Sequence, residues 1–216
     1  MKRALFVATS LVLVGGFFFA AQQFRENRTE ALGFLSQEQA QTFVRPHSPR
    51  YGPSDAKVFL VEFTDPACET CAAFGPILKK LMEPHADKIQ LVIRYAPFHE
   101  GAVDVVRLLE AARMQGKYWE TLDLVYRSQS AWTEHHRVQA GNLWQILSQH
   151  GDLDMELLSQ DVDDPAIRDI IEQDMADVQT LGVRKTPGIF VNGRPLEPFG
   201  VERLQQLIEE EVAASY

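Results

Sequence analysis

Cysteine is scarce in this sequence, with two residues among 216. Two cysteines are too few for a disulfide scaffold, so they form either one structural staple or a working pair. Basic residues are also in the minority, with 21 Lys and Arg against 30 Asp and Glu, a net charge of −9 and no basic patch. We therefore expect no nucleic acid among the partners of this protein.

The composition is that of a folded protein. Hydrophobic residues make up 45% of the chain and charged residues 24%, which provides enough apolar material for a substantial core. A length of 216 residues fits one elaborated domain or two small ones. We find no internal repeat.

The N-terminus carries a long uncharged run. Lys2 and Arg3 precede residues 4–21, eighteen residues without a charge, which would span about 27 Å as a helix, close to the hydrocarbon thickness of a bilayer. Residues 1–22 are therefore expected to be a cleaved secretory signal or an uncleaved membrane anchor. We favour the anchor, because cleavage at the end of the run would put a phenylalanine where a signal peptide needs a small residue. Either segment exports the rest of the chain.

The middle of the chain begins with a strand, helix and strand. Residues 23–50 are polar and are expected to form a tether that precedes the folded domain, residues 51–216. The apolar runs of residues 57–63 and 88–98 are typical of strands buried on both faces. Residues 68–82, between them, have helical content. This order predicts a βαβ unit with a parallel pair of strands.

The remainder of the domain indicates helices followed by a hairpin. Apolar stripes at helical spacing recur within an expected helical insertion at about residues 99–181. The sequence GIFVNGRPL, residues 188–196, is strand, Asn-Gly turn and strand, the strongest short hairpin signal. Residues 204–212 are expected to close the chain as an amphipathic helix. Without the insertion, the order is β-α-β followed by β-β-α.

Both cysteines lie at the expected start of the first helix, in the sequence VEFTDPACETCAAFGP. Cys68 and Cys71 are three residues apart, so on a helix they share a face and are close enough to form a disulfide. The helix N-terminus stabilises an anion at Cys68, and the thiolate is the nucleophilic form. Cys71 is expected to be more buried and to attack the mixed disulfide. The spacing therefore predicts a reversible two-electron switch.

Two other interpretations of the cysteine pair stay open. A purely structural disulfide would close a loop of only a few residues, and stabilisation grows with loop length. A zinc site needs four ligands, and the sequence has no second cysteine pair, although histidines could complete a site. We expect no metal.

Glu62 is the only charged residue inside the strand-like run VFLVEF. A buried carboxylate is costly unless it is paired or protonated, so the pKa of Glu62 is expected to rise. Groups with perturbed pKa values cluster at active sites, which favours a functional role. The alternative is a glutamate at a strand edge that reaches solvent.

The sequence resembles the thioredoxin superfamily, and most of all the bacterial periplasmic oxidoreductases of the DsbA type. The resemblance covers roughly residues 58–212. VEFTDPACETC resembles the family's strand-to-CxxC junction, and KTPGIFVNG resembles its cis-proline loop and hairpin. A helical domain of about eighty residues interrupts the fold after the second strand, as it does in that family. The resemblance implies an α/β, thioredoxin-like fold with an inserted helical domain, preceded here by the N-terminal segment.

The resemblance also implies roles for individual residues. Cys68 would be the attacking thiol, Cys71 the resolving thiol, and Pro187 the cis-proline that faces them. Glu62 matches the buried acid beneath the family's active site, where it would relay a proton for Cys71. The hydroxyl of Thr186, before the proline, could reach the sulfur of Cys68.

The sequence departs from the family between the cysteines. Strongly oxidising members have a histidine there, whereas this chain has Glu69 and Thr70. A carboxylate beside Cys68 disfavours the thiolate, and Lys185 acts in the other direction. The direction of electron flow therefore stays open.

The expected function is thiol–disulfide exchange with exported proteins on the periplasmic side of a bacterial inner membrane. The resemblance implies a membrane redox partner that regenerates the cysteine pair, and no cofactor besides the Cys68–Cys71 disulfide. Two alternatives use the same pair: a thioredoxin-like adaptor or chaperone, and a carrier of a soft metal such as Cu(I).

Overall fold

The computed structural model of the protein describes residues 42–135 and 137–216. The predicted anchor or signal segment, residues 1–22, lies outside the described residues, and so does most of the predicted tether, residues 23–50. Within the described ranges, none of the helices combines the length and the apolar character needed to cross a bilayer.

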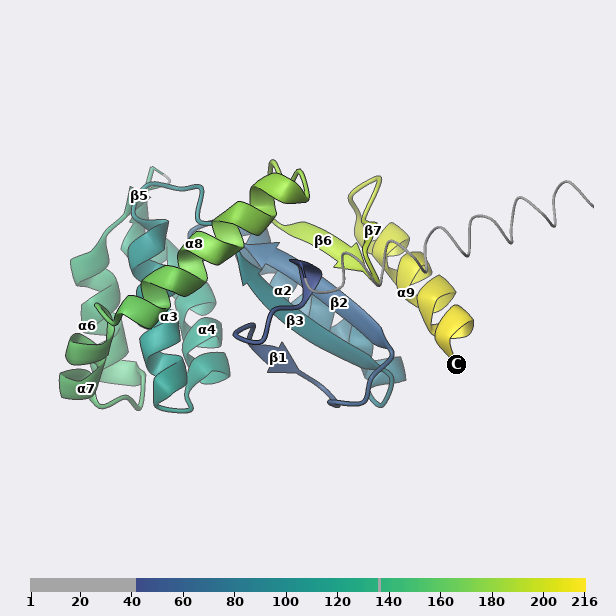
Figure 1. Ribbon diagram of the computed structural model, residues 1–216. Helices are drawn as coiled ribbons and strands as arrows, with labels where there is room; N and C mark the ends of the chain where they lie inside the picture. The colour runs from purple at the N-terminus through teal and green to yellow at the C-terminus, as the bar shows by residue number, and fades with distance from the viewer. Residues whose placement is uncertain (1–41, 136) are drawn as a thin grey trace, which may run out of the picture. The chain divides into compact units, whose positions relative to one another are not determined.

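A five-stranded mixed sheet organises the domain (Figure 1). Its strand order is β1-β3-β2-β6-β7. β2 and β3 are parallel, as predicted, and the other neighbouring pairs of this sheet are antiparallel. The strands are β1 Arg50–Tyr51, β2 Val58–Thr64, β3 Ile89–Tyr95, β6 Gly188–Val191 and β7 Arg194–Pro195.

The helices follow the strands in the predicted order. α2 (Glu69–Met82) connects β2 to β3 through a short 3-10 helix (Glu83–His85), and α9 (Val201–Ser215) follows the β6–β7 hairpin. The described chain between β3 and β6 holds the helical insertion and a two-stranded ribbon, β4 (Thr133–Glu134) with β5 (Arg137–Val138). Its helices are α3 Ala102–Met114, α4 Tyr118–Arg127, α5 Gln129–Trp132, α6 Ala140–His150, α7 Met155–Asp161 and α8 Pro165–Thr180.

The central strands are buried on both faces, because successive side chains of a strand point to opposite sides. On β2, Val58 and Leu60 join the core that contains α2 and α9, whereas Val61 and Phe63 join the core on the α8 side. All seven residues of β3 are buried. Double burial explains why both strands are near-continuous apolar runs in the sequence.

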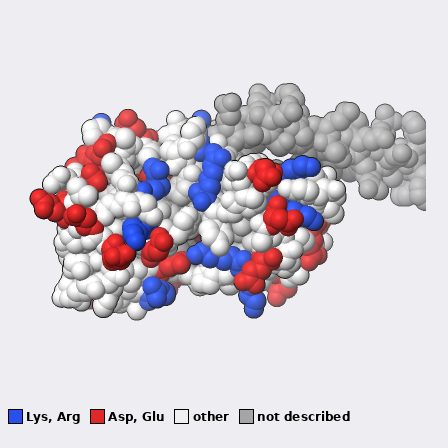
Figure 2. Space-filling view, turned by 90° about the horizontal axis from the view of Figure 1, so that it is seen from below, with Lys and Arg blue, Asp and Glu red and all other residues white. Residues whose placement is uncertain are grey.

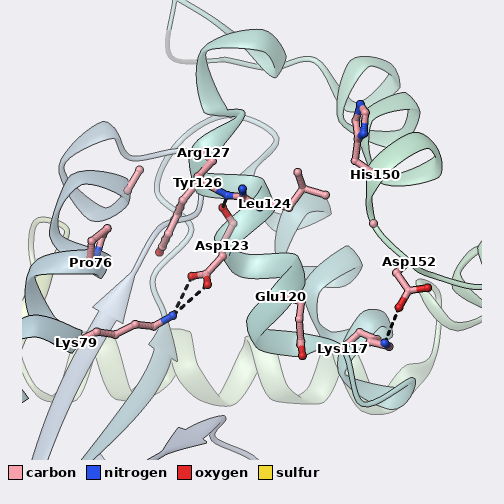
Figure 3. A pocket seen from close by; sticks show the side chains of 12 residues that line it. Pro76, Lys79, Lys117, Glu120, Asp123, Leu124, Tyr126, Arg127, His150 and Asp152 are labelled. Atoms are coloured by element: carbon pink, nitrogen blue, oxygen red, sulfur yellow. Dashed lines mark hydrogen bonds and ion pairs between the residues drawn. The ribbon is translucent and has the colours of Figure 1, made fainter. Parts of the chain in front are cut away.

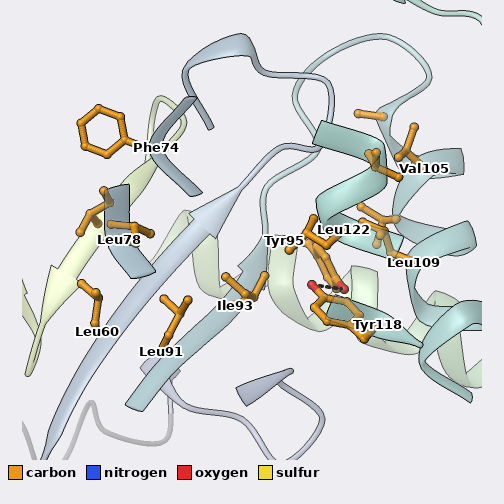
Figure 4. Packing of buried hydrophobic residues seen from close by; sticks show 14 of the residues in the cluster. Leu60, Phe74, Leu78, Leu91, Ile93, Tyr95, Val105, Leu109, Tyr118 and Leu122 are labelled. Carbon is orange, nitrogen blue, oxygen red and sulfur yellow. Dashed lines mark hydrogen bonds between the residues drawn. The ribbon is translucent and has the colours of Figure 1, made fainter. Parts of the chain in front are cut away.

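Helices cover both faces of the sheet, with α8 crossing one face and α2 lying behind the other (Figure 1). The core on the α2 side continues into the helical insertion (Figure 4). Buried polar groups in that core are bonded to one another. The hydroxyl of Tyr95 donates to Glu110 at 2.7 Å and lies 3.0 Å from the hydroxyl of Tyr118. Arg113 donates to the second oxygen of Glu110 at 2.7 Å.

Arg94 is the charged residue of β3, and its side chain is fully buried on the α8 side. Its guanidinium donates to Asp174 at 2.7 Å and to Asp177 at 2.5 Å, both on α8. Arg45 donates to Asp177 at 2.7 Å, and the imidazole of His47 lies 2.7 Å from Asp174. The two carboxylates of α8 are therefore shared between the sheet and the segment before β1.

The segment before β1 packs on the domain. Phe43 is 5% exposed, and its ring centroid lies 5.0 Å from that of Phe190. The carbonyl oxygens of Thr42 and Phe43 accept hydrogen bonds from Arg94. The segment predicted as a tether, residues 23–50, thus overlaps the folded domain from Thr42 onward. Its partners on β3 and α8 are distant in sequence, so local composition does not reveal them.

Charged side chains of both signs are interspersed over the face shown in Figure 2. Lys and Arg lie among Asp and Glu on the described part of this face rather than in one broad basic area. Such a surface accords with the acidic net charge of the sequence and offers little to a phosphate backbone.

Replacing Arg94 with leucine is expected to destabilise the fold by about 3–5 kcal/mol, because the change leaves the buried carboxylate of Asp174 without its guanidinium. Urea unfolding followed by circular dichroism measures the effect. The matched control is Arg137→Leu, which removes one partner of an ion pair with Glu100 that is exposed on both sides. The control should leave the unfolding free energy nearly unchanged. Equal effects of the two variants would show that the Arg94 network does not hold the fold together.

Candidate active site

The Cys-Glu-Thr-Cys sequence lies where β2 leads into α2. β2 ends at Thr64, and α2 begins at Glu69 with Cys68 as its N-cap, at φ −79° and ψ 119°. Both cysteines are free thiols. Cys68 is 7% exposed and Cys71 is 0% exposed, so the more accessible thiol lies at the helix N-terminus and the other is enclosed one turn further in.

Asp65 organises the turn that presents Cys68, and the sequence analysis missed it. Its buried carboxylate accepts hydrogen bonds from the backbone N–H groups of Ala67 at 2.8 Å, Phe98 at 2.7 Å and His99 at 2.8 Å. The Nδ1 atom of His99 also lies 2.7 Å from it. The backbone carbonyl of Asp65 accepts from the N–H of Cys68 at 3.0 Å. Asp65 thus ties the cysteine turn to the loop after β3, and its position directly after an apolar strand was the available signal.

The loop before β6 lies opposite Cys68. The peptide bond between Thr186 and Pro187 is cis, and the side chain of Pro187 is buried. The Cys68 sulfur lies 3.5 Å from the backbone oxygen of Thr186. The structure therefore brings Cys68, Cys71, Thr186 and Pro187 together, although they come from two segments more than 100 residues apart.

The pKa of the Cys68 thiol falls from its ordinary value to about 5. The largest cause is the hydrogen bond from the Cys71 thiol, and burial opposes it. The Thr186 side chain and the backbone N–H groups of Cys71 and Thr70 lower the pKa further. These N–H groups belong to the first turn of α2, where a helix leaves donors unpaired. Cys68 is therefore a thiolate near neutral pH.

The pKa values of two neighbouring groups, the Cys71 thiol and the Glu62 carboxyl, are raised rather than lowered. Burial is the main cause that raises the pKa of the Cys71 thiol, and its hydrogen bond to Cys68 and the charge of Glu62 add to the rise. Burial also raises the pKa of Glu62 to about 8, against a lowering by the Thr64 hydroxyl. Glu62 is 2% exposed, and its Oε1 atom has no hydrogen-bond partner among the described residues. This burial excludes the alternative of a glutamate that reaches solvent.

The side chains between the cysteines have less influence on the pKa of Cys68 than the sequence suggested. The side chains of Glu69 and Thr70 are exposed, and the charge of Glu69 is not among the largest influences on the pKa of Cys68. The expectation that Glu69 would disfavour the thiolate is therefore outweighed. Hydrogen bonds to the sulfur act at contact distance, whereas solvent screens an exposed carboxylate.

A groove of about 680 Å³ lies beside the site, between α2, α4 and the loop after α6 (Figure 3). Two ion pairs belong to its lining: Lys79 with Asp123 at 2.9 Å, and Lys117 with Asp152 at 2.7 Å. Tyr126 of α4 lines the same groove and points toward α2 (Figure 3). The sequence did not predict this groove, because its lining comes from separate elements.

Metal ligation was one of the alternatives for the cysteine pair. Across residues 42–135 and 137–216, no group of three or more His, Cys, Asp or Glu side chains is arranged to hold a metal ion.

Comparison with known proteins agrees with this geometry. The family described as Thioredoxin matches residues 45–210. The solved structure of a thioredoxin-like oxidoreductase from Silicibacter pomeroyi DSS-3 has a TM-score of 0.68 and 27% sequence identity to this chain. The match covers 79% of this chain and 95% of that chain.

Two curated relatives differ in how much of their length is matched. The Na(+)/H(+) antiporter NhaA of Herminiimonas arsenicoxydans is 34% identical over 145 residues, which cover 67% of this chain and 22% of the antiporter. The probable disulfide bond formation protein D of Bacillus anthracis is 28% identical over 167 residues, which cover 74% of this chain and 76% of that protein. The chain therefore spans less than a quarter of the antiporter and about three quarters of the second relative.

Replacing Glu62 with glutamine is expected to stabilise the reduced protein, by a margin that grows as the pH rises from about 4.5 to about 8. In that window the unfolded chain has released the Glu62 proton and the folded protein still holds it, so the stability of the unchanged protein falls with rising pH. The margin at the upper end should be on the order of 4 kcal/mol. Urea unfolding at a series of pH values measures it.

The control for this experiment is Glu202→Gln, on the exposed side of α9. The difference in unfolding free energy between this variant and the unchanged protein should be the same at every pH. If the difference for Glu62→Gln is also independent of pH, Glu62 does not hold its proton in the folded state.

Proposed function

The chain belongs to the thioredoxin family, and on that premise we propose that it is a thiol–disulfide oxidoreductase that exchanges disulfides with exported proteins through residues 68–71. The observation that carries this proposal is the contrast between the two thiols. Cys68 is a stabilised thiolate at a helix N-terminus, and Cys71 is a buried, protonated partner one turn away. This contrast supports Cys68 as the attacking thiol and Cys71 as the resolving thiol.

The proposed reaction oxidises a substrate dithiol. A substrate thiolate attacks the Cys68 sulfur of the Cys68–Cys71 disulfide, and Cys71 leaves and takes a proton from Glu62. The second substrate thiolate then attacks the substrate sulfur of the mixed disulfide. Cys68 leaves as a thiolate, the substrate loses two electrons, and the cysteine pair gains them. The loop at Pro187 supplies the surface opposite Cys68 on which a substrate strand would lie.

The low pKa of Cys68 supports this direction of electron flow. A stable thiolate favours the reduced form of the pair, and a low-pKa thiol is also the better leaving group. Both effects make the disulfide form a stronger oxidant. The direction that the sequence left open is therefore proposed to run from substrate to protein.

The proposal includes a location and partners. Export through residues 1–22 would place the domain on the periplasmic side of a bacterial inner membrane, where a membrane redox partner reoxidises the pair. The similarity to part of an antiporter, a protein that moves ions across a membrane, supports a site of action beside a membrane. The reaction uses the Cys68–Cys71 disulfide and no other cofactor.

The cysteine roles are tested by trapping. Cys71→Ser should accumulate mixed disulfides, formed when the Cys68 thiolate attacks a disulfide of an exported protein, because Cys71 is no longer present to displace that protein from Cys68. Cys68→Ser should accumulate none. Mass spectrometry of the trapped species after acid quenching identifies the sulfur involved. Trapping by the Cys68→Ser variant instead would reverse the assignment, and trapping by neither would favour the adaptor or chaperone function.

The direction is tested by equilibrium with glutathione. The potential of the pair should lie nearer to the roughly −120 mV of strong oxidants than to the roughly −270 mV of reducing thioredoxins. Thr186→Val, which removes a hydroxyl that stabilises the thiolate, should make the potential more negative and raise the pKa of Cys68. A potential near the reducing value in the unchanged protein would assign it to reduction or isomerisation.

A further inference from the structure

The proposed reaction moves a proton between two side chains that are buried and therefore cannot exchange it directly with solvent. Cys71 gains or loses a proton in each cycle, and Glu62 is the acid beside it. Cys71 is 0% exposed and Glu62 is 2% exposed. A substrate bound at Cys68 would cover the mouth of the site as well. The proton therefore needs a path through the protein.

Thr64 is placed to begin such a path. It lies two residues after Glu62 on β2, so both side chains point to the same face of the sheet. Its side chain is fully buried, and its hydroxyl acts on both the Glu62 carboxyl and the Cys71 thiol, lowering the pKa of each against the larger effect of burial. The same hydroxyl lies 2.7 Å from the hydroxyl of Tyr126.

Tyr126 lies between Thr64 and the groove. Its ring extends from α4 past Gly75 of α2, where a Cβ atom added to the glycine would lie 3.4 Å from the ring. Tyr126 also lines the groove of about 680 Å³ between these helices (Figure 3). The side chain thus contacts buried Thr64 through its hydroxyl and borders space that water can fill.

We propose that the hydroxyls of Thr64 and Tyr126 form a proton relay between the Glu62–Cys71 pair and the groove. This inference rests on the proposed oxidoreductase function and adds two positioning residues to it. A hydroxyl can donate its own proton while it accepts another, so each of these two hydroxyls can pass a proton along. When a disulfide oxidises the reduced protein, the proton of the Glu62 carboxyl first leaves through Thr64 and Tyr126 to water. Cys71 then gives its proton to the Glu62 carboxylate and attacks the mixed disulfide at Cys68, and the released substrate thiolate carries the electron pair.

Titratable groups from two helices interact electrostatically with Glu62. Cys68 and Cys71 approach from α2, and Tyr118 and Tyr126 approach from α4. Tyr118 bonds to Tyr95 and not, in the hydrogen bonds of the described residues, to Thr64. It is therefore a matched control: a buried tyrosine of the same helix, close to Glu62 but outside the proposed relay.

The test is stopped-flow oxidation of the reduced full-length protein by an aromatic disulfide that releases a coloured thiolate. The first thiolate reports the attack by Cys68, and the second reports the attack by Cys71. Tyr126→Phe and Thr64→Val should leave the first phase unchanged and slow the second at least about tenfold, part of the roughly 10²–10⁴-fold typical of positioned proton transfer. The double variant should be no slower than the slower single variant, because the two hydroxyls act in series.

Two further readouts distinguish a relay from a packing effect. The second phase should show a larger solvent deuterium isotope effect in Tyr126→Phe than in the unchanged protein, and imidazole buffer should restore part of its rate. Tyr118→Phe should show neither change. If Tyr126→Phe behaves like Tyr118→Phe, the proton leaves by the mouth of the site and the relay is wrong. If the unchanged protein releases no second thiolate, the proposed function fails instead.

Discussion

The geometry of the candidate active site depends on the buried guanidinium of Arg94. Arg94 lies on β3, beside β2, and its hydrogen bonds to two carboxylates hold α8 against the sheet. α8 ends at Thr180, and the chain then passes through a short loop to Pro187 and β6. The backbone oxygen before that proline is the group that the Cys68 thiol contacts. A shift of α8 on the sheet would therefore change the surroundings of the reactive sulfur.

The two central strands each carry one charged residue, Arg94 on β3 and Glu62 on β2, and these two side chains differ in their hydrogen bonding. Arg94 has two carboxylates and two carbonyl oxygens as partners. Glu62 has an oxygen without a hydrogen-bond partner among the described residues. Burying a polar group without a partner costs stability, and natural proteins tolerate that cost mainly at functional sites. The unsatisfied carboxyl lies beside Cys71, where a group that holds its proton near neutral pH is useful to the proposed chemistry.

The sequence predicted the features that depend on local pattern. Apolar runs predicted the parallel strands, the Asn-Gly pair predicted the hairpin, and a lone charge in an apolar run predicted the burial of Glu62. It missed features whose partners are distant in the chain, such as the bond from Arg94 to Asp174, 80 residues away. The balance of influences on the pKa of Cys68, which the sequence left open, depends on contacts of the same distant kind, because the loop that contacts the sulfur is 118 residues away in the chain.

The scarcity of cysteine has a consequence for oxidative damage. A low-pKa thiolate that keeps some exposure to solvent, as Cys68 does at 7%, is the form that peroxides convert to a sulfenic acid. Cys71, one helical turn away, can condense with that sulfenic acid and release water, which yields the disulfide of the proposed cycle. The sequence has no third cysteine, so no competing internal disulfide exists. Formation of the Cys68–Cys71 disulfide therefore protects Cys68 from further oxidation to the sulfinic and sulfonic acids, which are irreversible products. The disulfide itself can be reduced again by a thiol.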